Sequence, residues 1–253
     1  MEDKSKSKKG FEIHKVKDKF GSVRREHELL FPLPFKLLIC GKSMLSAKSS
    51  LIINLLLKED GYKNMFKGEN IYIINPSSNL DSKFEMLKHN LDIPSHNIFL
   101  EYDESIVSEL YDDLEKEAEE EMKEHNTIFP KLIIMDDVAY GNIYKNKKAG
   151  IMTKMMFNSR HIGLNLVLTS QKYSTFSTDA RENATAILVS SCSNKQLDLI
   201  EQDNNIISKK QFNSIFRKST NEPFTWFIIN YHNPAHQRYM DTNFRVIPID
   251  LEN

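Results

Sequence analysis

The fold is decided by one stretch of the chain, FKLLICGKSMLSAKSSLIINLLLKE (35–59). Its first part, FKLLIC (35–40), predicts a buried strand, and SSLIINLLLKE (49–59) predicts a helix. Between them lies the turn GKSMLSAKSS (41–50), which holds two lysines that are each followed by serine. A strand, a turn and a helix in this order form the framework of a phosphate-binding loop, in which backbone N–H groups and the helix N-terminus face an anion.

Lys48 is the better placed of the two lysines. Lys42 follows the strand directly, so no loop precedes it to wrap a phosphate, whereas Lys48 has a turn ahead of it and a helix behind it. The next residue, Ser49, then occupies the position whose hydroxyl binds Mg²⁺ in such loops. The candidate phosphate-binding residues are Gly41, Ser46, Ala47, Lys48, Ser49 and Ser50.

Two features of the loop depart from the common spelling G-x-x-x-x-G-K-[ST]. The spacing from Gly41 to Lys48 is one residue longer, and Ala47 stands where glycine normally precedes the lysine. Glycine is favoured there because it accepts backbone angles that other residues avoid. The loop alone therefore leaves open an ordinary strand–turn–helix with surface lysines.

The remaining apolar runs predict the rest of the domain. Short runs rich in Ile, Leu and Val alternate with polar segments, which is typical of a mainly parallel sheet covered on both faces, a three-layer α/β fold. The predicted strands are 70–75, 97–102, 131–137, 164–171 and 185–191, and the predicted helices are 104–126 and 193–203. The segments 224–231 and 244–249 predict a hairpin or two added strands near the C-terminal end.

The helix 104–126 carries apolar residues at Ile106, Leu110, Leu114 and Ala118, opposite a strongly acidic face. We expect that face to be solvated surface rather than a metal site. A lysine-rich segment, 1–28, precedes the domain, which we place at 29–253 because no clean linker interrupts it.

Composition narrows the class of protein. The 34 Lys and Arg residues balance 35 Asp and Glu residues, so any contact with DNA must come from local patches. Cys40 and Cys192 have no second ligand at metal spacing and are expected to be reduced core thiols. No apolar run reaches the roughly 18–20 residues of a membrane span, and the first residues are charged, so we expect a soluble cytosolic protein that does not contact membranes.

The strand KLIIMDD (131–137) ends in two carboxylates, Asp136 and Asp137. Open α/β sheets bind ligands at the carboxyl ends of their strands. In nucleoside triphosphatases one such carboxylate supports Mg²⁺ and another orients the attacking water. A plain strand followed by an Asp-rich turn is the alternative, and the upstream turn with Lys48 favours the nucleotide site.

The most specific segment is NSRHIGLNLVLTSQ (158–171), in which Arg160, Gly163 and an apolar strand ending at Gln171 follow the acidic strand. This order resembles the FtsK/HerA superfamily of DNA-pumping ATPases, and most closely the genome-packaging ATPases of large double-stranded DNA viruses and virophages. The resemblance covers residues 35–200 with four ordered motifs. It implies a P-loop NTPase fold of the RecA/FtsK-like type, with a mainly parallel sheet and added C-terminal strands, that uses ATP and Mg²⁺.

The resemblance also implies a role for each motif residue. Lys48 would contact the β and γ phosphates, Ser49 would ligate Mg²⁺ and Asp136 would support the metal. Asp137 would be the catalytic acidic residue, and Gln171 would sense the γ phosphate. Arg160 would be an arginine finger that reaches the neighbouring subunit's nucleotide, with Arg181 as a second candidate for that role.

The partners implied are double-stranded DNA, further copies of the chain in a homo-oligomeric ring, and capsid proteins, in the host cytoplasm (a viral factory) or in the virion. The loop YGNIYKNKKAG (140–150), with lysines among tyrosines, is the candidate DNA contact, and the lysines of 1–28 are a weaker one. Two alternatives stay open: a non-hydrolysing relative that acts in DNA binding or assembly, and another nucleotide-driven enzyme such as a helicase-like remodeller or a small-molecule kinase.

Overall fold

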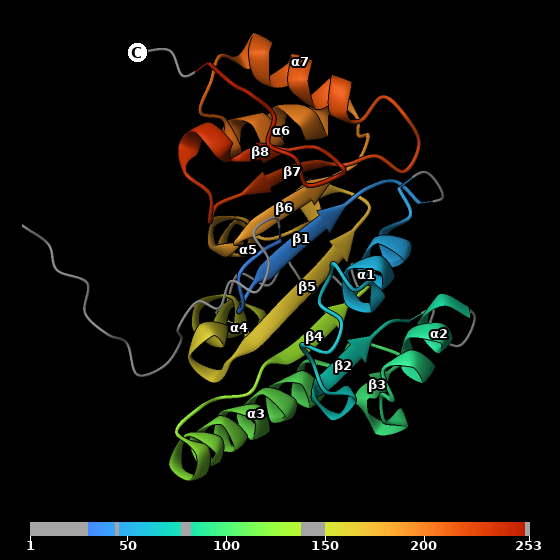
Figure 1. Ribbon diagram of the computed structural model, residues 1–253, viewed down its shortest axis with the longest axis vertical. Helices are drawn as coiled ribbons and strands as arrows, with labels where there is room; N and C mark the ends of the chain where they lie inside the picture. Colours follow the sequence, from blue (N-terminus) through green and yellow to red (C-terminus); the bar gives the residue numbers. More distant parts are fainter. Residues whose placement is uncertain (1–29, 44–45, 77–81, 138–149, 251–253) are drawn as a thin grey trace, which may run out of the picture.

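The computed structural model describes residues 30–43, 46–76, 82–137 and 150–250. Within them the chain forms one eight-stranded sheet with the order β3-β2-β4-β5-β1-β6-β7-β8 (Figure 1). Strands β1 to β6 run parallel, and β7 and β8 are added antiparallel. The strands are β1 Lys36–Cys40, β2 Ile71–Ile74, β3 Ile98–Phe99, β4 Lys131–Met135, β5 Leu164–Ser170, β6 Ala186–Val189, β7 Phe227–Asn230 and β8 Tyr239–Met240.

Helices cover both faces of the sheet, so the predicted three-layer, mainly parallel α/β fold is confirmed. One layer holds α1 Lys48–Leu57 and α2 Ser82–Asn90. The other holds α3 Glu104–His125, α4 Ile151–Asn158, α5 Thr178–Asn183, α6 Asn194–Asn204 and α7 Lys209–Ser219. The sequence analysis located α1, α3 and α6 and missed the other four.

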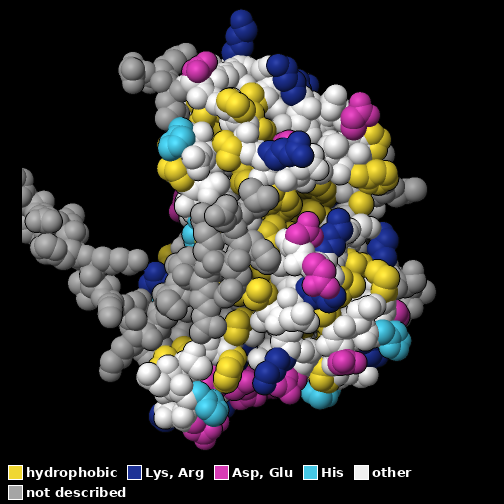
Figure 2. All heavy atoms as spheres, viewed as in Figure 1, with side chains coloured by type: hydrophobic (Ala, Val, Ile, Leu, Met, Phe, Trp, Pro, Cys, Tyr) yellow, Lys and Arg dark blue, Asp and Glu magenta, His cyan; other side chains and the backbone are white. Residues whose placement is uncertain are grey.

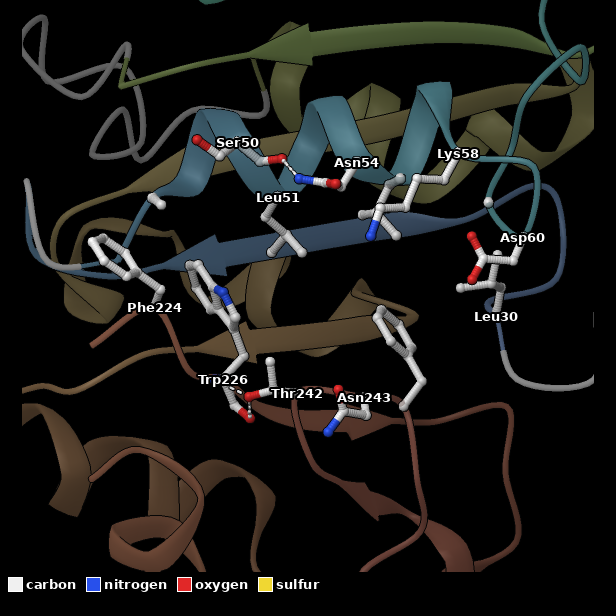
Figure 3. Close-up of a pocket in the computed structure, with 14 residues that line it drawn as sticks. Leu30, Ser50, Leu51, Asn54, Lys58, Asp60, Phe224, Trp226, Thr242 and Asn243 are labelled. Atoms are coloured by element: carbon white, nitrogen blue, oxygen red, sulfur yellow. Dashed lines mark hydrogen bonds between the residues drawn. The ribbon is translucent and has the colours of Figure 1, made fainter. Parts of the chain in front are cut away.

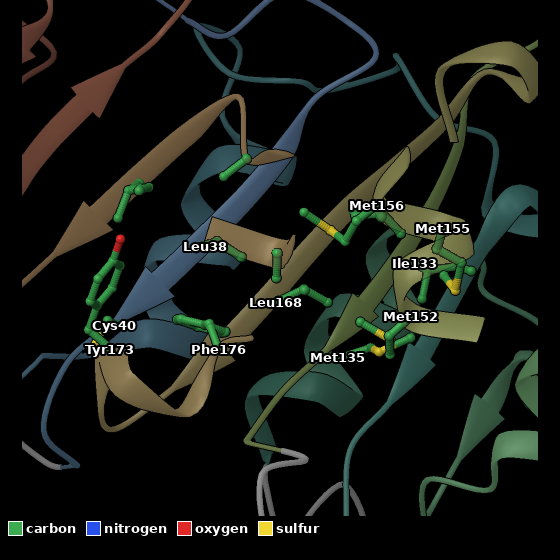
Figure 4. Close-up of a cluster of buried hydrophobic side chains, with 14 of the residues drawn as sticks. Leu38, Cys40, Ile133, Met135, Met152, Met155, Met156, Leu168, Tyr173 and Phe176 are labelled. Atoms are coloured by element: carbon green, nitrogen blue, oxygen red, sulfur yellow. The ribbon is translucent and has the colours of Figure 1, made fainter. Parts of the chain in front are cut away.

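The alternation of side chains along β1 shows how the sheet serves both layers. Leu38 and Cys40 face the α3–α7 layer, and Leu37 and Ile39 face the α1–α2 layer. Methionines of α4 and the aromatic residues Tyr173 and Phe176 pack over the first of these faces (Figure 4). Because both faces are buried, the central strands are continuous apolar runs rather than alternating ones.

The buried strip of the acidic helix α3 agrees with the predicted one at Leu114 and Ala118, but its first half lies one residue further on, at Val107 and Tyr111 instead of Ile106 and Leu110. Val107, Tyr111, Leu114 and Ala118 are buried, whereas Ile106 is 43% exposed. A spacing of four at every step drifts around a helix of 3.6 residues per turn, while alternating steps of four and three keep to one side. The opposite face is mostly exposed, and its Asp and Glu side chains gather over α3 in Figure 2.

The prediction that residues 244–249 form the second strand of the C-terminal hairpin is wrong. The strand that pairs with β7 is β8, and Val246 makes only an isolated bridge to Met240. Asp241 causes the difference, because its carboxylate accepts hydrogen bonds from the backbone N–H groups of Asn243 (2.8 Å) and Arg245 (3.1 Å) and closes a turn there. The predicted strand 97–102 is likewise reduced to the two residues of β3.

Both cysteines are free thiols. Cys40 is buried as expected, and burial raises its pKa to about 12, so it stays protonated. Cys192 is only half-buried, beyond the end of β6, and is not the core residue that was predicted.

In the described part of the chain, no helix is both long and apolar enough to cross a membrane. The segment 1–28, its boundary with the domain, and nearly all of the candidate DNA loop 140–150 lie outside the described residues.

One buried ion pair fastens α3 to β4. The Lys131 ammonium is fully buried and lies 2.7 Å from Glu121 Oε2, which also accepts a hydrogen bond from the backbone N–H of Phe129. A buried charge that loses its partner is costly, whereas removing both charges together is tolerated.

We therefore predict that Glu121→Leu destabilises the protein by about 3–5 kcal/mol, because it leaves the Lys131 ammonium buried without a counter-charge. The double variant Glu121→Leu/Lys131→Met should recover most of that loss. Urea denaturation followed by circular dichroism measures both. Asp113→Ala is the matched control, since its partner Lys116 is on the same helix and both side chains are more than 70% exposed. A double variant as unstable as the single one would contradict the prediction.

Candidate active site

The turn between β1 and α1 begins at a glycine that the packing requires. The Gly41 N–H donates to the Ser170 carbonyl of β5 at 3.1 Å. A Cβ atom at this position would lie 2.4 Å from Ser46 Cβ, far inside van der Waals contact. Ser46 is itself buried, and its hydroxyl donates to the Lys42 carbonyl at 2.7 Å. The start of the turn is thus packed too tightly to accept a side chain.

Ala47 adopts the conformation for which glycine is usually selected. Its φ of 52° and ψ of 45° are left-handed, which costs an alanine about 1–2 kcal/mol. Its carbonyl accepts the Leu51 N–H at 2.9 Å, so α1 begins immediately after it. The replacement of glycine therefore preserves the shape of the turn at some expense in stability.

Lys48 is buried at the N-terminus of α1, with 6% of its surface exposed. Its Nζ lies 3.3 Å from the Gly41 carbonyl oxygen and 3.2 Å from Asp137 Oδ2. The Lys48 ammonium thus lies close to Gly41, the first residue of the turn. Lys42 is exposed and lines a different cleft, so of the two lysines only Lys48 faces the acidic strand end.

Asp136 and Asp137 lie at the carboxyl end of β4, and a threonine on β5 organises both. The Thr169 hydroxyl donates to Asp136 Oδ1 at 2.6 Å and accepts the Asp137 N–H at 3.0 Å. Asp137 has a positive φ of 49°, and its carboxylate meets Lys48. The other oxygen of Asp136, Oδ2, is 3.5 Å from the Ser49 hydroxyl.

Sequence reasoning missed Thr169, although it lies within the quoted run LTSQ. It sits here because β5 is inserted between β1 and β4, with Thr169 paired in register to Ile39. A hydroxyl two positions before the predicted sensor was the available signal, since a polar residue in a buried strand needs a partner.

These side chains border one cleft of about 580 Å³ at the carboxyl edge of the sheet. It also includes four residues that the sequence analysis did not propose: Ser43 of the turn, Asn75 after β2, Lys83 of α2 and Phe224 before β7. Lys83 adds a second cation at the rim. The predicted residues that line the cleft are Ser46, Ala47, Lys48, Ser49, Ser50, Asp136 and Asp137.

The donor set fits Mg²⁺ that is shared with a phosphate ligand. A serine hydroxyl and a carboxylate are hard oxygen donors, and Mg²⁺ is usually held by one or two such groups together with waters and substrate phosphates. Among the described residues no group of three or more His, Cys, Asp or Glu side chains could hold a metal ion. Ser49 and Asp136 are therefore suited to a metal that arrives with a nucleotide.

The other predicted catalytic residues lie away from this cleft. Gln171 is exposed and lines a separate cleft of about 450 Å³ with Lys42 and Lys172. Arg160 is exposed on the short 3₁₀ helix Ser159–Ile162, at the opposite end of β5 from Thr169. Arg181 is ion-paired with Asp203 and stacks over Tyr173 within the same chain, which argues against it as an arginine that reaches another subunit.

The fold and the turn at Lys48 are those of the P-loop NTPase class. The structure is similar to that of the genome packaging NTPase B204 from Sulfolobus turreted icosahedral virus 2 in complex with AMPPCP, with a TM-score of 0.53 and 19% identity over 85% of this chain and 98% of that chain. It is also similar to B204, the DNA-packaging ATPase from Sulfolobus Turreted Icosahedral Virus, with a TM-score of 0.54 and 18% identity over 86% of this chain and 99% of that chain. A third similar structure is the pCW3 conjugation coupling protein TcpA with ATPγS, with a TM-score of 0.52 and 10% identity over 78% of this chain and 57% of that chain.

At these identities the similar structures establish the fold, and the family comes from the sequence. The family described as Poxvirus A32 protein matches residues 22–234, most of the chain. The protein belongs to this family. No curated protein matches the chain significantly.

We predict that Thr169→Val, which keeps the shape of the side chain and removes its hydroxyl, destabilises the protein by about 1–3 kcal/mol. The Asp136 carboxylate and the Asp137 N–H would both lose a buried hydrogen-bond partner. Thr169→Ser keeps the hydroxyl and serves as the control. Urea denaturation should show a clearly smaller loss for the serine variant, and equal losses would mean that the methyl group, not the hydroxyl, matters.

Proposed function

We propose that the protein is an ATP-hydrolysing motor subunit that drives double-stranded DNA into a viral capsid. The observation that carries this proposal is the meeting of Lys48, Ser49 and the Asp136/Asp137 pair in one cleft. Membership of the Poxvirus A32 protein family supports it, as does similarity in fold to B204, a genome packaging NTPase. Phosphoryl transfer needs positioning and charge neutralisation more than covalent chemistry, and these side chains provide both.

In the proposed mechanism Lys48 binds the β and γ phosphates, together with the backbone N–H groups of the turn and the first residues of α1. Ser49 and Asp136 would hold Mg²⁺, which would neutralise the charge of the phosphate oxygens. Thr169 fixes the Asp136 carboxylate through its 2.6 Å hydrogen bond, so that the metal-binding oxygen is oriented before nucleotide arrives.

Asp137 changes partner during the cycle. In the structure its carboxylate pairs with the Lys48 ammonium at 3.2 Å. Phosphate oxygens compete for that ammonium, and the carboxylate that is released can orient a water molecule toward the γ phosphate and accept its proton. The pairing thus keeps the two catalytic charges neutralised while the cleft is free of nucleotide.

Arg160 is proposed to act across a subunit boundary. Strand β5 has seven residues, so Arg160 lies roughly 20 Å from the site in its own chain at about 3.3 Å per residue. An arginine there serves only a neighbouring subunit, which makes hydrolysis depend on a homo-oligomeric ring. Gln171 remains a proposed sensor, although it lines the neighbouring cleft rather than the one at Lys48.

The proposal also includes contacts of the protein with double-stranded DNA and with capsid proteins, and a location in the host cytoplasm or the virion.

A second candidate function is a subunit that binds nucleotide for DNA binding or assembly without turnover. The extra residue of the loop favours it, because a longer loop alters the approach of the backbone to phosphate. Binding without hydrolysis in the presence of DNA would select this second function.

We predict that Lys48→Ala lowers steady-state ATP hydrolysis by about 10²-fold or more, since it removes the cation that faces the phosphates. Lys42→Ala, a change of the same type in the same turn, should retain hydrolysis. The measurement is phosphate release with Mg²⁺, with and without double-stranded DNA. The reverse result would place the phosphates at Lys42 and refute the register of the loop.

We predict that Arg160→Ala lowers hydrolysis by about 10³-fold while nucleotide affinity, measured by calorimetry, stays unchanged. Mixing it with Lys48→Ala subunits should restore part of the activity, because the second variant supplies the arginine to the intact site of the first. Arg181→Ala is the control, since Arg181 pairs within its own chain and its loss should not be complemented. Failure of the mixture to gain activity would rule out action in trans.

A further inference from the structure

A second cleft of about 420 Å³ adjoins the phosphate site, between α1 and the C-terminal hairpin (Figure 3). We propose that this α1–hairpin cleft, defined by Leu51, Asn54, Phe224, Trp226 and Phe244, binds the base and ribose of the nucleotide. The inference rests on the proposed function, because it extends the nucleotide whose phosphates meet Lys48. Its volume is within the range of about 300–1,000 Å³ of small-molecule sites.

The two clefts adjoin each other. Ala47, Ser50 and Phe224 line both of them. A base is tethered to its phosphates through the ribose, so it must leave the phosphate cleft on a side that is open to a second cavity. The cleft at Lys42 and Gln171 shares no lining residue with the phosphate cleft within the described chain, and therefore does not qualify.

The walls suit a flat aromatic ring. Leu51 projects from α1 toward Trp226, and Phe224 flanks the end of the cleft nearest the phosphate site (Figure 3). Phe224 is 57% exposed, so its ring is accessible to a base that would stack on it and cover it. Base–aromatic stacking contributes about 1–3 kcal/mol per base.

The aromatic residues are held in position before any ligand binds. The Trp226 N–H donates to Thr242 Oγ1 at 2.7 Å, and that hydroxyl donates to the Trp226 carbonyl at 3.3 Å. Phe244 packs edge-on against Phe31, with 5.6 Å between ring centroids. Preorganised side chains lose little freedom on binding, which favours affinity.

Backbone strain is concentrated at the same place. Seven non-glycine residues of the described chain have positive φ, and five of these are Ala, Asn or Asp. The other two are Phe224 (φ 64°) and Phe244 (φ 59°), and both line this cleft. Bulky residues avoid this region of backbone space, and strain of this kind clusters at ligand sites.

Asn54 gives the cleft a preference among bases. Its Nδ2 donates to the Ser50 carbonyl at 2.7 Å, which leaves Oδ1 as an acceptor at the wall of the cleft. An acceptor favours a base that carries an exocyclic amino group at the matching edge, as adenine does, over one that carries a carbonyl there.

Trp226 is the only tryptophan of the chain and reports directly on this cleft. The full chain is titrated with MgADP and, separately, with magnesium tripolyphosphate, while tryptophan fluorescence and calorimetric affinity are recorded. Both ligands should bind, and only ADP should change the emission of Trp226. Phe224→Ala should weaken ADP binding about 5- to 160-fold, the equivalent of the stacking energy, and alter tripolyphosphate affinity less than twofold.

Phe157→Ala is the matched control, because Phe157 is 53% exposed on α4 and lines neither cleft. It should leave the affinity for both ligands unchanged. If ADP and tripolyphosphate both bind but Phe224→Ala leaves ADP affinity unaltered, the base site is refuted and the phosphate site stands. If neither ligand binds, the proposed function itself fails. Inosine diphosphate, with a carbonyl in place of the amino group, should bind more weakly than ADP, and equal affinity would refute the role of Asn54.

Discussion

The buried hydroxyl of Thr169 joins elements that the chain order keeps apart. It donates to the Asp136 carboxylate and accepts the Asp137 N–H, so that β5 orients both acids at the end of β4. The Asp136 carboxylate in turn accepts a hydrogen bond from Ser49 of α1, and Asp137 forms an ion pair with Lys48. Two hydrogen bonds to a single side chain therefore set the relative positions of the two carboxylates proposed to bind the metal and to act in catalysis. This geometry is stable because the Thr169 hydroxyl and the Asp136 carboxylate are buried, so water does not compete for their hydrogen bond.

The atypical loop becomes intelligible once its backbone is known. The family of loops it resembles places glycine before the lysine, and here Ala47 takes the same left-handed conformation. Alanine carries the smallest side chain that still opposes this conformation, so the turn keeps its shape at a cost of about 1–2 kcal/mol. The glycine that cannot be replaced is Gly41, where neighbouring Ser46 leaves no room for a Cβ atom.

The C-terminal hairpin links the sheet to the proposed nucleotide site. Strands β7 and β8 extend the parallel sheet on the side of β6, and the residues before and after them return to α1. Phe224 borders both the phosphate cleft and the α1–hairpin cleft. A segment that extends the sheet thus also supplies the aromatic wall proposed for the base, and local strain at Phe224 and Phe244 accompanies that second role.

Much of this protein could be predicted from local sequence. Continuous apolar runs identified the central strands, because both faces of a parallel sheet are buried, and the strand–turn–helix order identified Lys48. Four helices and the bounds of β8 were not predicted. The polar turn at Asp241, rather than apolar content, ended the last strand, and the α3 strip differed because steps of four alone do not follow the helical period.

What only the tertiary structure decided is which residues meet. Strand order inserts β5 between β1 and β4, so Thr169 enters the site while Gln171, two residues on, lines another cleft. Arg160 lies just before the other end of the same strand, away from the cleft that holds Lys48. Sequence determines the elements because hydrophobic periodicity is local, whereas the site depends on contacts between distant strands, and those follow from how the sheet is ordered and packed.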